Sequence, residues 1–160
     1  MATVFIGYAT RSGTTTDIAG AVAEQLRDLD HTVDIVNLKD RPELPDADLI
    51  VLGSGINGGA WYGEATAWVS TNAARLQSMN VALFNACLNA ANPDKRAECL
   101  AYNKQIADKV QPEANESFAG RYVPAHVGWF RRVFLKALQQ APQDHVDLDA
   151  VRRWAATLIA

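Results

Sequence analysis

The sequence has little of what marks a secreted, membrane-spanning or nucleic-acid-binding protein. Its 160 residues include only two cysteines, Cys87 and Cys99, whose spacing fits no metal motif and which cannot form a disulfide framework. No apolar run approaches the roughly 18 residues of a membrane span. Fifteen basic and eighteen acidic residues leave a net charge of −3, which is too small to indicate a nucleic-acid partner.

What the sequence contains is typical of an ordinary globular domain. Hydrophobic residues make up 49% and charged residues 21% of the chain, and the length predicts one domain over residues 1–160. The first residues carry no charged leader or cleavage site, and two cysteines suit a reducing compartment. We therefore expect a cytoplasmic protein.

Apolar runs alternate with helical patterns along the whole chain. Such alternation predicts strand-helix-strand units and an α/β fold with a parallel sheet. The expected strands are 3–8, 32–38, 48–53, 80–86 and 117–123, and the expected helices follow the stripe from Ile18 to Leu29 and then cover 64–76, 94–110 and 148–159. Asp147 or Asp149 is placed to cap the last helix. Residues 124–144 remain as an insertion before that helix.

A hydroxyl-rich loop follows the first expected strand and leads into the first helix. Thr10, Ser12, Thr14 and Thr15 supply hydroxyl groups, and Gly13 lets the backbone approach a ligand closely. The first amides of a helix are unsatisfied and attract anions. The loop has neither the glycine-lysine pattern of a nucleotide triphosphatase nor the three glycines of a dinucleotide-binding fold, so a monophosphate is the predicted ligand. The alternative is a polar turn with a threonine cap.

The insertion has an amphipathic pattern. If residues 128–140 form a helix, large apolar side chains share one face and cations share the other. Such a helix suits a membrane surface, a quinone pocket or an anionic substrate, and its simpler interpretation is a helix packed over the sheet edge. The apolar face comprises Trp129, Phe130, Val133, Phe134, Ala137 and Leu138, and the cations are Arg131, Arg132 and Lys136.

Several segments, in order along the chain, resemble one known family. The segment Ala9-Thr-Arg-Ser-Gly-Thr-Thr15 resembles the FMN phosphate loop of flavodoxins. Within the flavodoxin superfamily, it is most similar to the same loop of the small menaquinone-dependent protoporphyrinogen IX dehydrogenases. Gly53-Ser-Gly-Ile-Asn-Gly-Gly59 is similar to part of that family's second loop, and Pro93-Asp-Lys-Arg96 is similar to the end of its third loop. Two motifs near the carboxyl end of the family's sequence resemble the residues Ala119, Gly120, Tyr122 and Pro124 and the segment Trp129-Phe-Arg-Arg-Val-Phe134.

The resemblance implies a flavodoxin-like, doubly wound sheet of five strands in the order 2-1-3-4-5. It also implies an FMN-dependent oxidoreductase of heme biosynthesis that passes electrons from a porphyrinogen-like substrate to a quinone. Three alternatives stay open: a flavodoxin-type electron carrier, a protein that binds a deazaflavin coenzyme, and a non-enzymatic module that assembles with a partner. Asn57 and Gly58 depart from the family, which has Arg-Tyr there.

The resemblance further assigns residues to the site. No side chain is expected to be catalytic and no metal is expected, because the flavin carries the chemistry. Either Trp61 or Tyr62 is expected to stack on the ring, the alternative for Trp61 being a packing role, and Cys87 is expected to be a small buried residue. The cofactor residues are Thr10, Arg11, Ser12, Gly13, Thr14, Thr15, Ser54, Ile56, Asn57, Gly58, Trp61, Ala86, Cys87, Leu88 and Asn89. The cations for a substrate's carboxylates are Lys95, Arg121, Arg131 and Arg132. The oligomeric state stays open.

Overall fold

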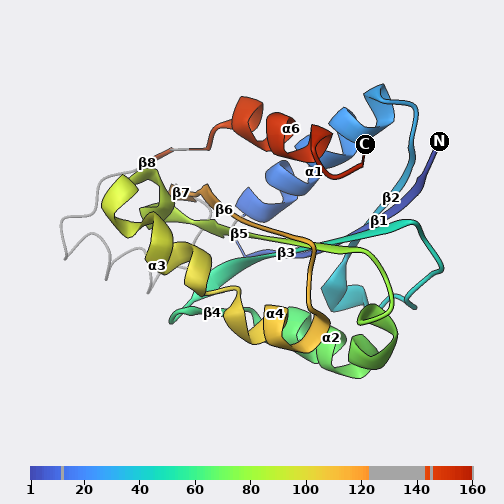
Figure 1. Cartoon of the computed structure of the whole chain (residues 1–160). Coiled ribbons are helices and arrows are strands. Elements are labelled where there is room, and N and C mark those ends of the chain that lie inside the picture. The colour runs from blue at the N-terminus through green and yellow to red at the C-terminus, as the bar shows by residue number, and fades with distance from the viewer. Residues whose placement is uncertain (12, 123–142, 145, 160) are drawn as a thin grey trace.

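A computed structural model describes residues 1–11, 13–122, 143–144 and 146–159 (Figure 1). A parallel sheet runs through the middle of the molecule, with helices on both of its faces. The strands are β1 (Thr3–Ala9), β2 (Thr32–Asn37), β3 (Leu49–Asn57), β5 (Val81–Cys87) and β6 (Ala114–Ala119). Their order is β2-β1-β3-β5-β6, which confirms the expected order of five alternating strands.

The two faces of the sheet are covered by different helices. Helices α1 (Thr14–Asp28) and α6 (Leu148–Ala156) lie on one face, and α2 (Gly63–Leu76) and α4 (Lys104–Val110) lie on the other (Figure 1). Strands covered on both faces are apolar at nearly every position, and all seven residues of β5 are buried. Asp147 accepts a hydrogen bond from the Ala150 amide, so it is the expected cap of α6.

The fifth strand begins and ends earlier in the chain than predicted. The fifth strand is Ala114–Ala119, and the predicted remainder forms β7 (Arg121–Tyr122), which pairs with β8 (Gln143–Asp144) in a separate sheet. Gly120 separates the two strands at a crowded point, where a Cβ would lie 3.0 Å from the Leu88 nitrogen.

The helix predicted over 94–110 is divided into shorter pieces. It consists of the 3-10 helix η3 (Pro93–Lys95), then α3 (Arg96–Ala101), then α4. The break falls at Asn103, a fully buried residue whose side chain is committed to hydrogen bonds beneath the helices. Two further 3-10 helices are η1 (Leu38–Asp40) and η2 (Leu88–Ala91).

Most of the predicted insertion lies outside the residues that the structure describes. Of the insertion, only β8 belongs to the described part of the chain, so the expected amphipathic helix over 128–140 lies outside it. Among the described residues, no helix is both long enough and apolar enough to cross a membrane.

Candidate functional site

Three loops leave the carboxyl edge of the sheet at neighbouring positions. The register pairs Ala9 with Ser54, and Gly55 with Ala86, so the ends of β1, β3 and β5 lie side by side. The chain leaves β1 and β3 toward opposite faces of the sheet, through α1 and α2, and ligands bind at such switch points in open α/β sheets. The sequence-predicted loops therefore meet at one edge.

The first loop joins β1 to α1 and is shaped for an anion. Thr10 Oγ1 accepts a hydrogen bond of 2.9 Å from the Gly13 amide, which closes the loop on itself. Gly13 has a φ of 88°, in the left-handed region that favours glycine, and serves as the N-cap of α1 without a side-chain cap hydrogen bond. Thr14 and Thr15 are buried in the first turn. Ser12 lies outside the described residues.

The second loop is a hairpin, and the strand that leads into it extends beyond its predicted end at residue 53. Strand β3 continues to Asn57 and turns back into β4 (Ala60–Trp61), with which it pairs antiparallel. Gly58 and Gly59 make the turn with φ of 61° and 80°. Ile56 and Trp61 face each other across the hairpin, and Asn57 and Gly58 are exposed at its tip.

Of the two residues expected to stack on the ring, Trp61 takes the packing role that was its alternative. Trp61 is only 5% exposed, packs in the core beneath α2, and donates its indole N–H to Asn103 at 2.7 Å. Its neighbour Tyr62 is half-buried at the site, and its ring packs directly against the backbone of Gly55. A Cβ on Gly55 would lie only 2.8 Å from the tyrosine ring. Tyr62 is therefore the aromatic residue that the second loop presents.

Ser54 connects the two ends of this hairpin through hydrogen bonds of its side chain. Its hydroxyl is fully buried, accepts a hydrogen bond from the Tyr62 amide at 3.0 Å, and donates to the Gly55 carbonyl at 2.7 Å. The hydroxyl therefore fixes the backbone of Tyr62 against the end of β3. Both of these hydrogen bonds are made within the protein, whereas the sequence predicted that Ser54 contacts a cofactor.

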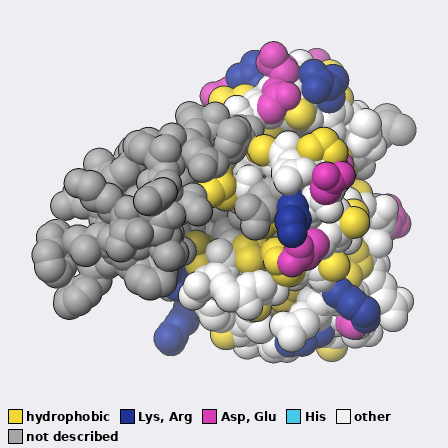
Figure 2. Space-filling view, turned by 90° about the vertical axis from the view of Figure 1, so that its left-hand side faces the viewer, with side chains coloured by type: hydrophobic (Ala, Val, Ile, Leu, Met, Phe, Trp, Pro, Cys, Tyr) yellow, Lys and Arg dark blue, Asp and Glu magenta, His cyan; other side chains and the backbone are white. Residues whose placement is uncertain are grey.

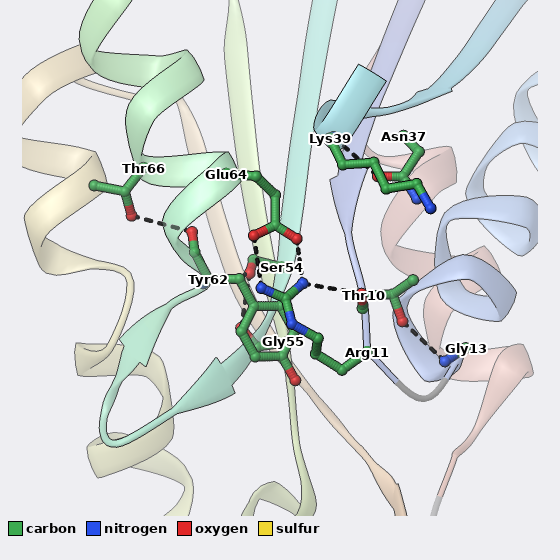
Figure 3. A network of polar contacts seen from close by, with 10 residues as sticks. All are labelled: Thr10, Arg11, Gly13, Asn37, Lys39, Ser54, Gly55, Tyr62, Glu64 and Thr66. Atoms are coloured by element: carbon green, nitrogen blue, oxygen red, sulfur yellow. Dashed lines mark hydrogen bonds and ion pairs between the residues drawn. The ribbon is translucent and has the colours of Figure 1, made fainter. Parts of the chain in front are cut away.

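An ion pair connects the first loop with the second (Figure 3). The guanidinium of Arg11 makes two hydrogen bonds to the carboxylate of Glu64 at the start of α2. It also lies 4.3 Å above the centre of the Tyr62 ring, within the range of a cation–π contact. Hydrogen bonding from Arg11 lowers the pKa of Glu64, and the same bond raises the pKa of Arg11. The sequence analysis did not identify Glu64.

The third loop follows β5 and carries the remaining predicted cofactor residues. Ala86 and Cys87 are the last, buried residues of the strand, and Leu88 and Asn89 lie in η2. Cys87 is small and buried at a strand end, as expected. Its sulfur lies 2.9 Å from that of Cys99 in α3, a pairing that the sequence analysis missed.

Of the four predicted substrate cations, the structure describes Lys95 and the backbone of Arg121. Lys95 is exposed in η3, and Arg121 belongs to β7, where its backbone pairs with Asp144. Arg131 and Arg132 lie outside the described part of the chain. Figure 2 shows the face that lies on the left-hand side of Figure 1. Among the side chains coloured there, basic and acidic groups are interspersed rather than gathered by sign.

A buried network of amides supports the second and third loops from below. The side chain of Asn103 accepts hydrogen bonds from Trp61 and from Asn85, and it donates to the Glu116 carbonyl at 3.1 Å. Asn85 also accepts from the hydroxyl of Ser117 at 2.6 Å. These groups connect β4, β5, α4 and β6. Isolated asparagines give no sequence pattern, so this network could not be predicted.

Comparison with known proteins identifies similar chains. Residues 5–149 match the model of the flavodoxin domain family. A protoporphyrinogen IX dehydrogenase [quinone] of Escherichia coli strain K12 is 26% identical over 145 residues, which cover 88% of this chain and 80% of that protein.

Solved structures share the fold. Flavodoxin 1 of Bacillus cereus superposes with a TM-score of 0.61 at 16% identity, covering 98% of this chain and 97% of that one. The rubredoxin oxygen:oxidoreductase of Desulfovibrio gigas gives a TM-score of 0.60 at 14% identity. In that case 99% of this chain matches only 37% of the larger protein.

Proposed function

Because this chain belongs to the flavodoxin domain family, we propose that it is an FMN-dependent oxidoreductase. The observation that carries the proposal is the first loop, in which Gly13 opens α1 without a side-chain cap directly beside the hairpin that presents Tyr62. A helix amino end next to an aromatic residue offers one subsite for a phosphate and one for a flat ring.

The residues present fit the chemistry of FMN. Hydroxyl groups of Thr10, Thr14 and Thr15 and the amides at the start of α1 would hold the phosphate, because they are neutral donors that gather around an anion. Tyr62 and the ends of β3 and β5 would hold the ring. The bound flavin would accept and release pairs of electrons, and the protein would supply position and exclude water.

The proposed substrate is a porphyrinogen-like electron donor, with a quinone as the acceptor. The support is the 26% identity to an E. coli protein whose name states this reaction. A porphyrinogen carries carboxylates, and Lys95, Arg121, Arg131 and Arg132 are the cations proposed to pair with them. Asn57 and Gly58 at the exposed hairpin tip are the proposed determinants of any difference in specificity.

Anaerobic titration of the apoprotein tests the cofactor. We expect FMN to bind with perturbation of its visible spectrum, and riboflavin, which lacks the phosphate, to bind at least tenfold more weakly because the first loop is left empty. Equal binding of the two would overturn the role of the first loop. Preference for a deazaflavin coenzyme over FMN would overturn the choice of cofactor.

Addition of protoporphyrinogen IX to the FMN complex tests the substrate. Bleaching of the flavin, followed by its recovery on addition of a menaquinone analogue, is the expected result. A complex that is reduced by dithionite but not by the porphyrinogen would retain the flavoprotein and exclude this substrate. Reoxidation by a protein partner but by no quinone would favour an electron carrier.

A further inference from the structure

The only two cysteines of the chain lie against each other beneath the third loop. Cys87 ends β5, Cys99 lies within α3, and their sulfur atoms are 2.9 Å apart although twelve positions separate them in sequence. A disulfide bond has a sulfur separation near 2.05 Å, so the two atoms need to approach by less than about 1 Å. Both cysteines are free thiols in this structure.

We propose that Cys87 and Cys99 form a reversible disulfide that ties the end of β5 to α3 and closes the third loop. The bond itself is independent of the proposed function. Its effect on the cofactor rests on that function, because residues 88–98 between the two cysteines include the part of the third loop proposed to lie beside the flavin.

The surrounding structure holds the two sulfur atoms face to face. Cys87 pairs with Ala119 at the carboxyl end of β5 and β6, and its carbonyl accepts a hydrogen bond from the Gly120 amide at 3.0 Å. The carbonyl of Cys99 accepts a hydrogen bond of 2.8 Å from Asn85, which anchors α3 over β5. Each backbone is thus fixed by contacts that do not involve the other thiol, and the proximity is a property of the scaffold.

The two thiols differ in a way that assigns their order of reaction. Cys87 is 9% exposed and Cys99 1%, so a small oxidant reaches Cys87 first. Burial raises the pKa of the Cys99 thiol to about 12, which keeps it protonated until a partner sulfur is activated beside it.

A hydroperoxide is the oxidant whose size suits this site, and the chemistry balances. Cys87 attacks the peroxide, the O–O bond breaks, and Cys87 becomes a sulfenic acid as one water leaves when the oxidant is hydrogen peroxide. Cys99 then attacks that sulfur, the S–O bond breaks, its proton leaves with the hydroxyl as a second water, and the S–S bond forms. Two thiols and one peroxide give one disulfide and two waters, and a dithiol reductant reverses the change.

The sequence permits a direct test by mass spectrometry. Trypsin cuts after Lys95 and Arg96, which lie between the two cysteines, so reduced protein yields separate peptides 76–95 and 97–104. The native protein is treated with one equivalent of hydrogen peroxide, its free thiols are alkylated, and it is digested without reductant. We expect a linked pair of these peptides, lighter by two hydrogen atoms than their sum, that dithiothreitol separates. Recovery of Cys87 as a sulfinic acid with Cys99 alkylated would overturn the proposal.

Variants and a second readout sharpen the test. Cys99→Ala removes the resolving thiol, so the sulfenic acid on Cys87 should persist and be trapped by dimedone. Should that variant fail to fold, the wild-type peptide test still decides, because it needs no substitution. We also expect oxidation to slow amide exchange over residues 88–98 and leave α1 unchanged. A linked peptide without flavin binding would overturn the proposed function alone, and flavin binding without a linked peptide would overturn this inference alone.

Discussion

The two sides of the sheet are built on different principles. On the side of α1 and α6 the core is hydrocarbon, and Phe84, Phe118 and Trp154 pack there with ring centroids 5.4 to 6.1 Å apart. Among the described residues, the buried polar side chains on this side are Thr14 and Thr15, in the first turn of α1.

On the side of α2 and α4 the core is apolar at one end and hydrogen-bonded at the other. Asn85 and Asn103 are fully buried, and they connect the two loops that leave β3 and β5. Apolar packing is tolerant of small displacements, whereas a buried amide needs its partners at defined positions. The comparison teaches that both sides of the sheet contribute apolar packing, and that the side of α2 and α4 also fixes the second and third loops through buried amides.

The largest effect is expected on the hydrocarbon side. Phe84→Ala removes a fully buried ring that fills the space over Gly53, and it should lower the free energy of unfolding by about 3–5 kcal/mol. Urea unfolding measures this loss, with the exposed Leu29→Ala as the control, which should change stability by less than about 0.5 kcal/mol. FMN affinity of the folded fraction should stay near wild type. A tenfold loss of affinity would remove the distinction between the two sides.

The next effect is expected on the hydrogen-bonded side. Asn103→Ala leaves the buried Trp61 indole N–H without its acceptor and should cost about 2–3 kcal/mol. Because the same amide supports both loops, FMN affinity should fall as well. The exposed Asn115→Ala removes one hydrogen bond to Asn103 and should cost less than about 1 kcal/mol with little effect on affinity. Titration and urea unfolding of both variants separate these outcomes.

Two glycines, one at the N-cap of α1 and one inside the helix, distinguish an effect on the site from an effect on helix stability. Gly13→Ala places a side chain at a φ of 88°, which should destabilise by about 1–2 kcal/mol and weaken FMN more than riboflavin. Gly20→Ala, in the helix interior with open space around it, should stabilise by about 0.5–1 kcal/mol and leave binding unchanged. Thermal unfolding and parallel titrations test both. The pair contradicts our account if both substitutions alter FMN affinity alike.

The smallest effect is expected where the two sides meet, at the ion pair of Arg11 and Glu64. Arg11 is half-exposed, so a double-mutant cycle with Arg11→Ala and Glu64→Gln should give less than about 1 kcal/mol. The pKa of Glu64 in the folded protein lies below its ordinary value of 4.5, so the pair stabilises the fold above that pH. Its contribution is lost as the pH falls through the folded-state pKa. A coupling that grows on acidification would contradict this sign.

The sequence predicted the sheet well because burial on both faces leaves an unmistakable pattern. The runs that became β1, β5 and the first part of β3, residues 49–52, are apolar at almost every position, which is typical of strands covered on both faces. The loop from Thr10 to Thr15 was also predictable, because hydroxyl groups and a glycine before a helical stripe have a local chemical meaning.

Other features depend on contacts that are distant in sequence. The choice between Trp61 and Tyr62 follows from the turn at Gly58 and Gly59, because a shift of one residue in a hairpin exchanges the buried and presented side chains. The break of the predicted helix at Asn103 and the contact between Cys87 and Cys99 arise from partners on other elements. No periodicity within either segment encodes them.

The short ladder of β7 and β8 has a consequence for how this protein can vary. Because Arg121 pairs with Asp144 and Tyr122 pairs with Gln143, the two ends of the intervening segment are held side by side. Closure entropy grows only slowly with the number of residues between two paired ends, by about 0.6 kcal/mol for each doubling. The pairing of β7 with β8 therefore lets this part of the chain differ in length between related proteins while the carboxyl edge of the sheet keeps its geometry.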